Sequence, residues 1–290
     1  FKSKCSMKKL VIVLLVAMLL PVSIDAKKKS DVDYDLKVMS YNIRMGVAKD
    51  GTNSWEYRYP ATALMLQNQM PDVFGVQEAF EFQIRFIEDN FADYESVGVG
   101  RDNGKSEGEF MSIFWNKKTV KMVKWGTFWL SETPEKPSLG WDAACKRTAT
   151  WALMKDKNTG KMFYFVNTHL DHKGKEAQRK GLDLIVSRID EINPKGYPMV
   201  LTGDFNMTPD DEALVDLDKQ MTSTRTIAAK TDDLSTFNGW GDPEIPEHFL
   251  IDYIYVKGFK SVPEYATIVK QYAGKPFVSD HYPIISVLEY

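Results

Sequence analysis

The stretch PMVLTGDFN (residues 198–206) decides the fold. Its first half, Pro198–Thr202, is a short apolar run that is typical of a buried β-strand. Polar residues follow directly, and side chains two apart along an extended chain point to the same side. We therefore expect Asp204 and Asn206 to face one cleft while Phe205 faces the core. On their own, the two polar residues would be interpreted as an Asx turn that caps the next helix.

Four other short polar motifs lie along the chain. They are SYNIR (residues 40–44), QE (77–78), NTH (167–169) and SDH (279–281). The first three follow apolar lead-ins of strand type, at Val38-Met39, Val73–Val76 and Phe163–Val166. A rigid sheet can hold the polar groups at its strand ends around one cleft. The five motifs together therefore indicate a single site.

Hydrophobic periodicity and turn residues also predict the main elements. The predicted helices are Tyr59–Met70, Glu81–Asn90 and Lys175–Ile192. The predicted strands, besides Pro198–Thr202, are Leu36–Asn42, Val73–Gln77, Tyr94–Gly100, Phe110–Trp115, Val120–Leu130, Trp151–Met154, Met162–Asn167, Ile251–Val256 and Ile284–Leu288. Many strands interleaved with a few long helices favour an α/β sandwich.

The motifs GDFN and SDH, with Ile251-Asp252 between them, resemble the endonuclease/exonuclease/phosphatase family. The stretches FWLSE (residues 128–132) and GWD (140–142) resemble its secreted bacterial members in particular. The resemblance extends from Leu36 to Tyr290. This DNase I-like superfamily includes pancreatic-type deoxyribonucleases, abasic-site endonucleases, inositol polyphosphate 5-phosphatases, bacterial sphingomyelinases and deadenylases. The resemblance implies a four-layer α/β/β/α sandwich of two packed mixed β-sheets.

Phosphoester hydrolysis requires an activated water, neutralised phosphoryl oxygens and a stabilised leaving oxygen. A hard divalent cation held by carboxylates supplies much of this stabilisation. The resemblance assigns Glu78 and the carbonyl oxygen of Asn42 to Mg²⁺, with Mn²⁺ as a possible substitute, and Asp280 is the third candidate ligand. Alternatively, Glu78 is an acid at a helix N-terminus and Asn42 a turn residue.

The catalytic roles follow from the same resemblance. Asp204 aligns or deprotonates the attacking water, and the amide of Asn206 donates to the phosphoryl oxygens. His281 is the expected general base or electrostatic partner of the nucleophile. A catalytic imidazole needs an orienting acceptor on its second nitrogen, and Asp252 is the candidate.

His169, at the end of another strand, is expected to donate to the phosphate. His172 is expected at the rim of the cleft, and His248 has no assigned role. A zinc site built from His169, His172 and His281 with nearby acids is the alternative explanation for these residue types. It is disfavoured because no cysteine contributes and the motifs already have roles.

Substrate selection is expected to come from loops. Arg101 and Arg147 are candidates for binding a second phosphate, and each is equally a candidate for a structural ion pair. Trp240 could stack on a base or a sugar. The alternative is a tryptophan that packs against its own loop.

The N-terminus has the pattern of a secretory signal. Lys8-Lys9 precedes an apolar run, residues 10–20, and Ala26 is a plausible cleavage point. The predicted organisation is a signal peptide over residues 1–26, a flexible lead-in over 27–35 and one catalytic domain over 36–290. The expected location is therefore secreted or periplasmic. An uncleaved membrane anchor is the alternative, although the run is shorter than the roughly 20 residues of a spanning helix.

The net charge and the cysteine content limit the disulfides and the binding partners that can be expected. Without residues 1–26 the chain has 33 basic and 39 acidic side chains, a formal net charge of −6, and one cysteine, Cys145. No intrachain disulfide is then possible. Enzymes that grip duplex DNA usually carry a basic face, and no comparable Lys/Arg cluster occurs here. We expect a monomer without a strong duplex-DNA signature.

The sequence therefore predicts a secreted, Mg²⁺-dependent phosphoesterase that cleaves a phosphodiester or phosphomonoester. Its substrate would be a nucleic acid, a phospholipid, an inositol phosphate or a sugar phosphate. The second hypothesis is a nuclease or 3′–5′ exoribonuclease of deadenylase type. The third is a non-enzymatic, ligand-binding member, which the complete set of catalytic residues argues against.

Overall fold

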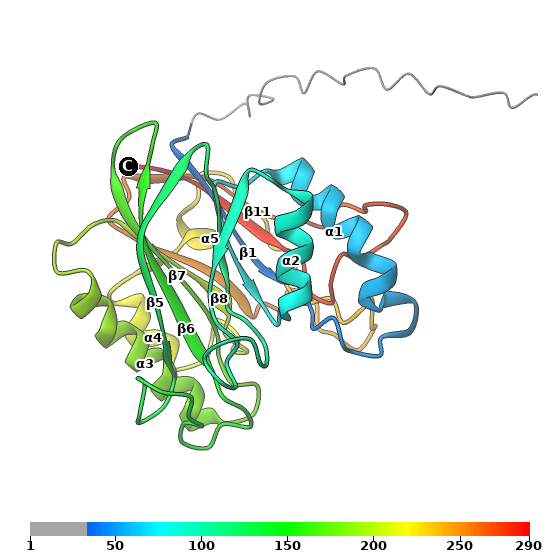
Figure 1. Ribbon diagram of the computed structural model, residues 1–290, viewed down its shortest axis with the longest axis horizontal. Helices are drawn as coiled ribbons and strands as arrows, with labels where there is room; N and C mark the ends of the chain where they lie inside the picture. The colour runs from blue at the N-terminus through cyan, green and yellow to red at the C-terminus, as the bar shows by residue number, and fades with distance from the viewer. Residues whose placement is uncertain (1–33) are drawn as a thin grey trace, which may run out of the picture. The chain divides into compact units, whose positions relative to one another are not determined.

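A computed structural model describes residues 34–290, which belong to one compact unit (Figure 1). The predicted signal peptide and residues 27–33 of the predicted lead-in lie outside the described residues. Asp35, at the end of that lead-in, is joined to the last strand, because its N–H donates to Leu288 O at 3.0 Å. Within residues 34–290, no helix is long and apolar enough to cross a bilayer.

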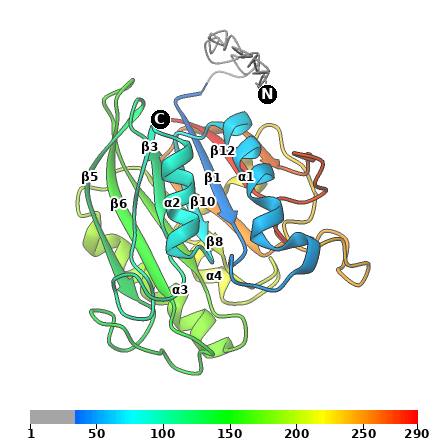
Figure 2. The same ribbon diagram turned by 45° about the vertical axis from the view of Figure 1, so that its right-hand side comes forward.

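The fold is built on two six-stranded mixed sheets (Figures 1 and 2). The first has the order β11-β12-β1-β2-β4-β3, and the second β5-β6-β7-β8-β10-β9. The strands of the first sheet are β1 Leu36–Asn42, β2 Val73–Gln77, β3 Tyr94–Val97, β4 Ile113–Asn116, β11 Ser261–Thr267 and β12 Ile284–Glu289. Those of the second are β5 Val120–Trp129, β6 Thr148–Asp156, β7 Met162–His169, β8 Met199–Asp204, β9 Thr222–Ser223 and β10 Asp252–Lys257.

Helices cover the two outer faces. The helices are η1 Gly51–Asn53, α1 Trp55–Gln69, α2 Glu81–Asn90, α3 Lys175–Ile192, α4 Leu214–Asp218 and α5 Thr224–Ile227. Figure 2 shows α1 and α2 in front of the first sheet and α3 beside the second. The strand period of two explains this layering, since Val38 of β1 packs between the sheets and Met39 packs under the helices. The predicted four-layer α/β/β/α sandwich is confirmed.

Several predicted elements agree with the structure to the residue, namely β1, β2, α2 and α3. The helix predicted at Tyr59–Met70 instead begins one turn earlier, at Trp55, so Pro60 lies inside it rather than near its start. The extra turn is held because Trp55 and Arg58 are buried. The strand expected at Phe110–Trp115 begins only at Ile113.

Strand β11 was not predicted. Pro263 argues against a central strand because it has no N–H to donate. The structure accommodates it at the sheet edge, where the register with β12 shifts between Ser261 and Glu264.

A buried amide joins the two sheets beneath the strand ends. Asn167 Nδ2 donates to Val76 O at 2.8 Å, and Gln77 Nε2 donates to Asn167 Oδ1 at 2.7 Å. A Cβ on Gly75 would lie 2.4 Å from Asn167 Cγ, so only glycine leaves room for this link. The link crosses the sandwich interior and fixes the position of one sheet on the other.

Candidate active site

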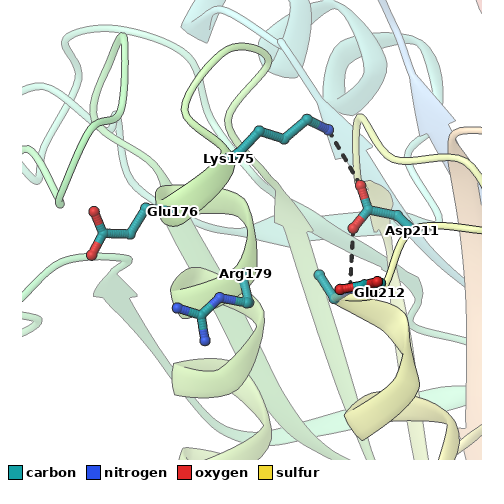
Figure 3. A pocket seen from close by; sticks show the side chains of 6 residues that line it. Lys175, Glu176, Arg179, Asp211 and Glu212 are labelled. Carbon is teal, nitrogen blue, oxygen red and sulfur yellow. Dashed lines mark hydrogen bonds and ion pairs between the residues drawn. The ribbon is translucent and has the colours of Figure 1, made fainter.

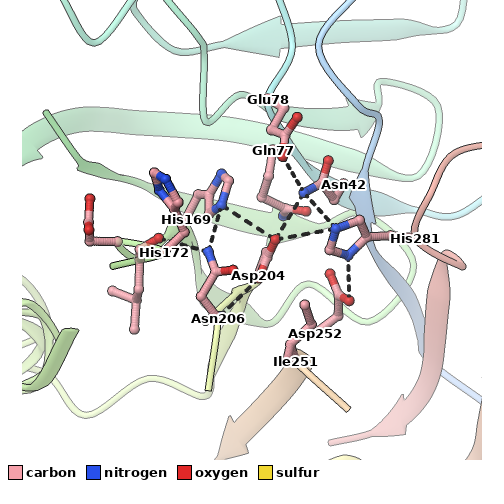
Figure 4. A network of polar contacts seen from close by, with 12 residues as sticks. Asn42, Gln77, Glu78, His169, His172, Asp204, Asn206, Ile251, Asp252 and His281 are labelled. Atoms are coloured by element: carbon pink, nitrogen blue, oxygen red, sulfur yellow. Dashed lines mark hydrogen bonds and ion pairs between the residues drawn. The ribbon is translucent and has the colours of Figure 1, made fainter. Parts of the chain in front are cut away.

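The site lies where strand ends of both sheets meet. In the first sheet, parallel β1 and β2 end side by side, with Asn42 opposite Gln77. In the second, Asp204 pairs with His169 of parallel β7 on one side and with Asp252 of antiparallel β10 on the other. The register, with the contacts of His281 to Asn42 and Asp252, brings the polar motifs together in one buried cluster (Figure 4).

The amide of Asn42 lies at the centre of the cluster. Its Nδ2 is 3.0 Å from Glu78 Oε1, 2.9 Å from Asp204 Oδ2 and 3.4 Å from His281 Nε2. Its Oδ1 accepts from the N–H of Arg44 at 3.0 Å. The nitrogen, rather than the carbonyl oxygen proposed as a cation ligand, thus faces the acidic groups.

His281 is paired as the family pattern implies. Its Nδ1 lies 2.8 Å from Asp252 Oδ2, and its Nε2 lies 3.6 Å from Asp204 Oδ2. Burial alone would lower the pKa of His281, but the charges of Asp252 and Asp204 outweigh it and raise the pKa. Burial raises the pKa of Asp204, and Asp252 and Glu78 act in the same direction. The imidazole therefore readily holds a proton between two carboxylates.

His169 differs from His281 in its surroundings. Its Nε2 lies 3.0 Å from Asn206 Nδ2 and 3.4 Å from Asp204 Oδ2. Burial, with the nearby charges of Arg147 and Arg101, holds its pKa well below the usual value. The ring is neutral, and Nε2 accepts from the Asn206 amide. Donation to a phosphate from Nε2 therefore requires the other tautomer.

The sequence offered two interpretations of the GDFN turn, namely a pair of site-facing side chains and an Asx turn, and the structure shows both. Asp204 Oδ1 accepts from the N–H of Asn206 at 2.9 Å, which is an Asx turn, and both side chains still face the site. Strand alternation is not the cause, because β8 ends at Asp204 and Asn206 has a left-handed backbone with φ 53°. Phe205 is fully buried, as predicted.

Left-handed backbone recurs at the site. Glu78 has φ 62° and Arg44 has φ 58°, like Asn206. Such conformations cost free energy for residues other than glycine and persist where surrounding contacts enforce them. At Glu78, the N–H of Met45 donates to Oε2 at 3.0 Å, while Asn42 holds Oε1. The turn after β2 thereby directs the carboxylate into the cluster.

Asp280 is not among the ligand atoms of Glu78, Asp204 and His281 that lie within 4.8 Å of one another. Its carboxylate accepts from Ser279 Oγ at 3.1 Å and lies 3.5 Å from Arg44 Nη1. Whether Asp280 binds a cation stays a prediction.

The proposed substrate residues have structural partners. Arg101 Nη1 is 2.6 Å from Glu109 Oε2, and Arg147 Nε is 3.3 Å from Asp171 Oδ2. Both arginines therefore form the ion pairs that the sequence offered as the alternative. Trp240 is half-buried, and its ring lies 5.7 Å from the guanidinium of buried Arg58.

The alternative zinc site does not form as expected. His172 is exposed, and its Nδ1 lies 3.0 Å from Arg147 Nη2, away from His281. The argument that no cysteine contributes was wrong, because Cys145 lies close to Asp171 and His172. We call Cys145, Asp171 and His172 the loop cluster.

A separate hollow lies beside the start of α3 (Figure 3). Lys175 Nζ spans it to Asp211 Oδ2 at 3.2 Å. Glu176, Arg179 and Glu212 also line it, so its charges are mixed. None of the predicted site residues lines this hollow.

The donor set fits a hard divalent cation. Glu78, Asp204 and His281, which we call the catalytic cluster, offer one carboxylate or imidazole atom each, all within 4.8 Å of one another. All three are buried. The carboxylate oxygens of Glu78 and Asp204 suit Mg²⁺ or Mn²⁺. Glu78 is not needed for proton transfer. Burial alone would raise the pKa of Glu78, but the hydrogen bond from the Asn42 amide and the nearby positive charges lower it.

Comparison with known proteins identifies the family. The family model for endonuclease/exonuclease/phosphatase proteins matches residues 39–281. The chain belongs to this family. Its members are hydrolases that act on phosphoester bonds and depend on divalent metals, and this chain is a hydrolase of phosphoester bonds.

Three relatives cover most of the chain. A mannosyl-6-phosphatase of Bacteroides thetaiotaomicron is 33% identical, covering 88% of this chain and 100% of its own, with a TM-score of 0.82. A family protein of Bacteroides vulgatus is 35% identical, with coverages of 89% and 99% and a TM-score of 0.82. An uncharacterised protein, L388, of Acanthamoeba polyphaga mimivirus is 26% identical over 280 residues, which are 88% of this chain and 100% of that protein.

Some site residues were missed from the sequence. Arg44 and Gln77 lie within quoted motifs but had no role. Glu109, buried between Arg101 and His169, had been overlooked, and its Oε2 lies 4.0 Å from His169 Nδ1. A buried acid directly after the glycine-rich stretch 100–108 is the one local signal that could have indicated it.

Proposed function

We propose that the protein is a Mg²⁺-dependent phosphatase that hydrolyses a phosphomonoester of a sugar. The observation that carries the reaction type is the approach of three buried groups, Glu78, Asp204 and His281, to the single Asn42 nitrogen. The sugar phosphate is supported by the full-length likeness to the mannosyl-6-phosphatase. The net acidic composition also favours a small substrate over duplex DNA.

Each residue has one role in this proposal. Glu78 would hold the cation, and Asn42 would join it through Oδ1 after a rotation of its amide; the bound cation would neutralise charge on the phosphoryl oxygens. Asp204 orients the attacking water and accepts its proton, and the His281–Asp252 pair stabilises the negative charge that develops beside it. Asn206 and His169 bind phosphoryl oxygens from the side of β7.

We further propose that the chain is exported and cleaved near Ala26, and that it acts as a monomer outside the cytoplasm. The support is the basic and apolar pattern of residues 8–20. N-terminal sequencing of the exported protein tests the cleavage, and an intact apolar segment in the membrane fraction would favour an anchor instead.

A substrate panel in Mg²⁺ tests the reaction. We expect release of phosphate from hexose 6-phosphates, much slower turnover of a bis(p-nitrophenyl) phosphodiester, and loss of both in excess chelator. Digestion of a polyadenylate RNA with no sugar-phosphate turnover would establish the nuclease hypothesis instead. Full activity in chelator would exclude the cation dependence.

A further inference from the structure

Arg44 lies over the acidic side of the site and contacts three carboxylates. Its Nε and Nη2 each lie 3.0 Å from an oxygen of Asp50. Its Nη1 is 3.5 Å from Asp280 Oδ2 and 4.0 Å from Glu78 Oε2. One guanidinium therefore connects the loop after β1 to two of the acids that the sequence had assigned to a cation.

This guanidinium is held in place rather than free to swing. The Arg44 carbonyl accepts from Arg58 Nη2 at 2.8 Å and from Gln83 Nε2 at 3.0 Å. Its N–H donates to Asn42 Oδ1, and the backbone is left-handed. With two bonds to Asp50 at the other end, both the backbone and the charged group are fixed.

The charges around the Arg44 guanidinium indicate what it does. Glu78, Asp204, Asp280 and Asp50 can carry four negative charges, while His281 balances Asp252. Arg44, the nearby buried Arg58 and one divalent cation together supply four positive charges. A second divalent cation on Asp280 would lie beside the guanidinium, whose Nη1 is 3.5 Å from Asp280 Oδ2, and the repulsion between like charges at that distance is large in a buried site.

We propose that Arg44 is an internal counter-cation that withholds Asp280 from metal binding and limits the centre to one divalent cation. The inference rests on the proposed cation dependence. It assigns Asp280 to Arg44 and leaves Glu78 as the carboxylate that holds the cation.

The test counts cations without measuring activity. Metal-free protein is titrated with Mn²⁺, and free Mn²⁺ is measured by its electron paramagnetic resonance signal. We expect one Mn²⁺ per wild-type chain. Arg44→Met, which keeps the length of the stem and removes the charge, should bind a second Mn²⁺, and Arg44→Met/Asp280→Asn should lose it again. Arg85→Met, at an exposed arginine paired with Glu81, is the matched control and should bind one.

The outcomes separate the two proposals. Wild-type protein that binds no Mn²⁺ overturns the proposed function. Two Mn²⁺ in wild type, or one in a folded Arg44→Met protein, overturns the role of Arg44. If Arg44→Met does not fold, Arg44→Gln removes the charge and keeps a side chain that can donate to Asp50. It should admit a second Mn²⁺ in a folded protein, and a stoichiometry of one there would also contradict the inference.

Discussion

The catalytic cluster and the loop cluster contain similar residue types at similar spacing, yet their electrostatics are opposite. Each brings three candidate ligand atoms within 4.8 Å of one another. In the catalytic cluster, burial raises the pKa of Asp204. In the loop cluster, burial alone would raise the pKa of Asp171 too, but backbone N–H groups of Gly174, Lys173 and Ala144 lower it.

The difference lies in what the carboxylates have already bound. Asp171 accepts from Lys173 N and Gly174 N at 2.9 Å, from Ala144 N at 3.2 Å and from Arg147. Both carboxylate oxygens of Asp171 thus already accept hydrogen bonds that hold the loops together. Asp204 accepts from one backbone N–H and from the Asn42 amide, and it faces two imidazoles. Proximity of acids and histidines therefore does not identify a reactive site unless their acceptors remain available.

The largest expected difference between the two clusters is the loss of kcat when a member is substituted. Asp204→Asn and His281→Ala should each lower kcat by about 10²-fold or more, the usual scale for general acid–base groups, with a smaller change in KM. Because both serve one step, the double variant should be little slower than the poorer single variant. Asp171→Asn should lose less than about 10-fold. Steady-state kinetics on a sugar phosphate measure this, and wild-type turnover by His281→Ala would disprove the mechanism.

The second prediction concerns stability. Asp171→Asn should lower the free energy of unfolding by about 3 kcal/mol at pH 7, because an amide nitrogen would face the donors of Ala144 and Arg147. Asp204→Asn should change it by less than about 1 kcal/mol, since it removes a carboxylate that burial already disfavours. Urea unfolding followed by circular dichroism gives both values. Equal losses in the two variants would remove the distinction between the clusters.

The loss of unfolding free energy caused by Asp171→Asn should depend on pH. The pKa of Asp171 is lower in the folded state than the unfolded value of about 3.9, so its stabilisation is complete above that pH and is lost as pH falls. The stability difference between wild type and Asp171→Asn should therefore shrink between about pH 5 and pH 3. A constant difference across that range would show that the carboxylate charge is not the cause.

Metal affinity should distinguish the clusters next. Glu78→Gln should weaken Mn²⁺ binding by about 10-fold or more, because it removes the ligand charge and keeps the shape. His172→Ala should leave the affinity unchanged, because His172 faces solvent and Arg147. Calorimetric titration compares the two, and the reverse order would place the cation in the loop cluster.

The smallest effect is expected at Cys145. Its Sγ is 3.7 Å from Asp171 Oδ2, a weak contact, and burial raises the pKa of the thiol. Cys145→Ser should change the free energy of unfolding by no more than about 0.5 kcal/mol and leave kcat unaltered. A large loss of activity would mean that the loop cluster has a catalytic role.

The sequence alone determined the fold class and named the candidate catalytic residues. Alternating and apolar runs located the strands other than β9 and β11 to within about three residues, and the polar motifs named Glu78, Asp204 and His281. These are local signals, since strand periodicity and turn chemistry are written in neighbouring residues. The order of the motifs then pointed to the family.

Only the tertiary structure decided which polar groups bind one another. Asn42 and His281 are 239 residues apart in the sequence and lie side by side because β1 and β12 pair. The same pairing brings Asp280 to Arg44, and the β7–β8 register brings His169 to Asp204. Burial and hydrogen bonding set the pKa of each group, and these depend on neighbours that the chain supplies from distant segments. For this reason no local pattern shows that the pKa of Asp204 is raised while that of Asp171 is lowered.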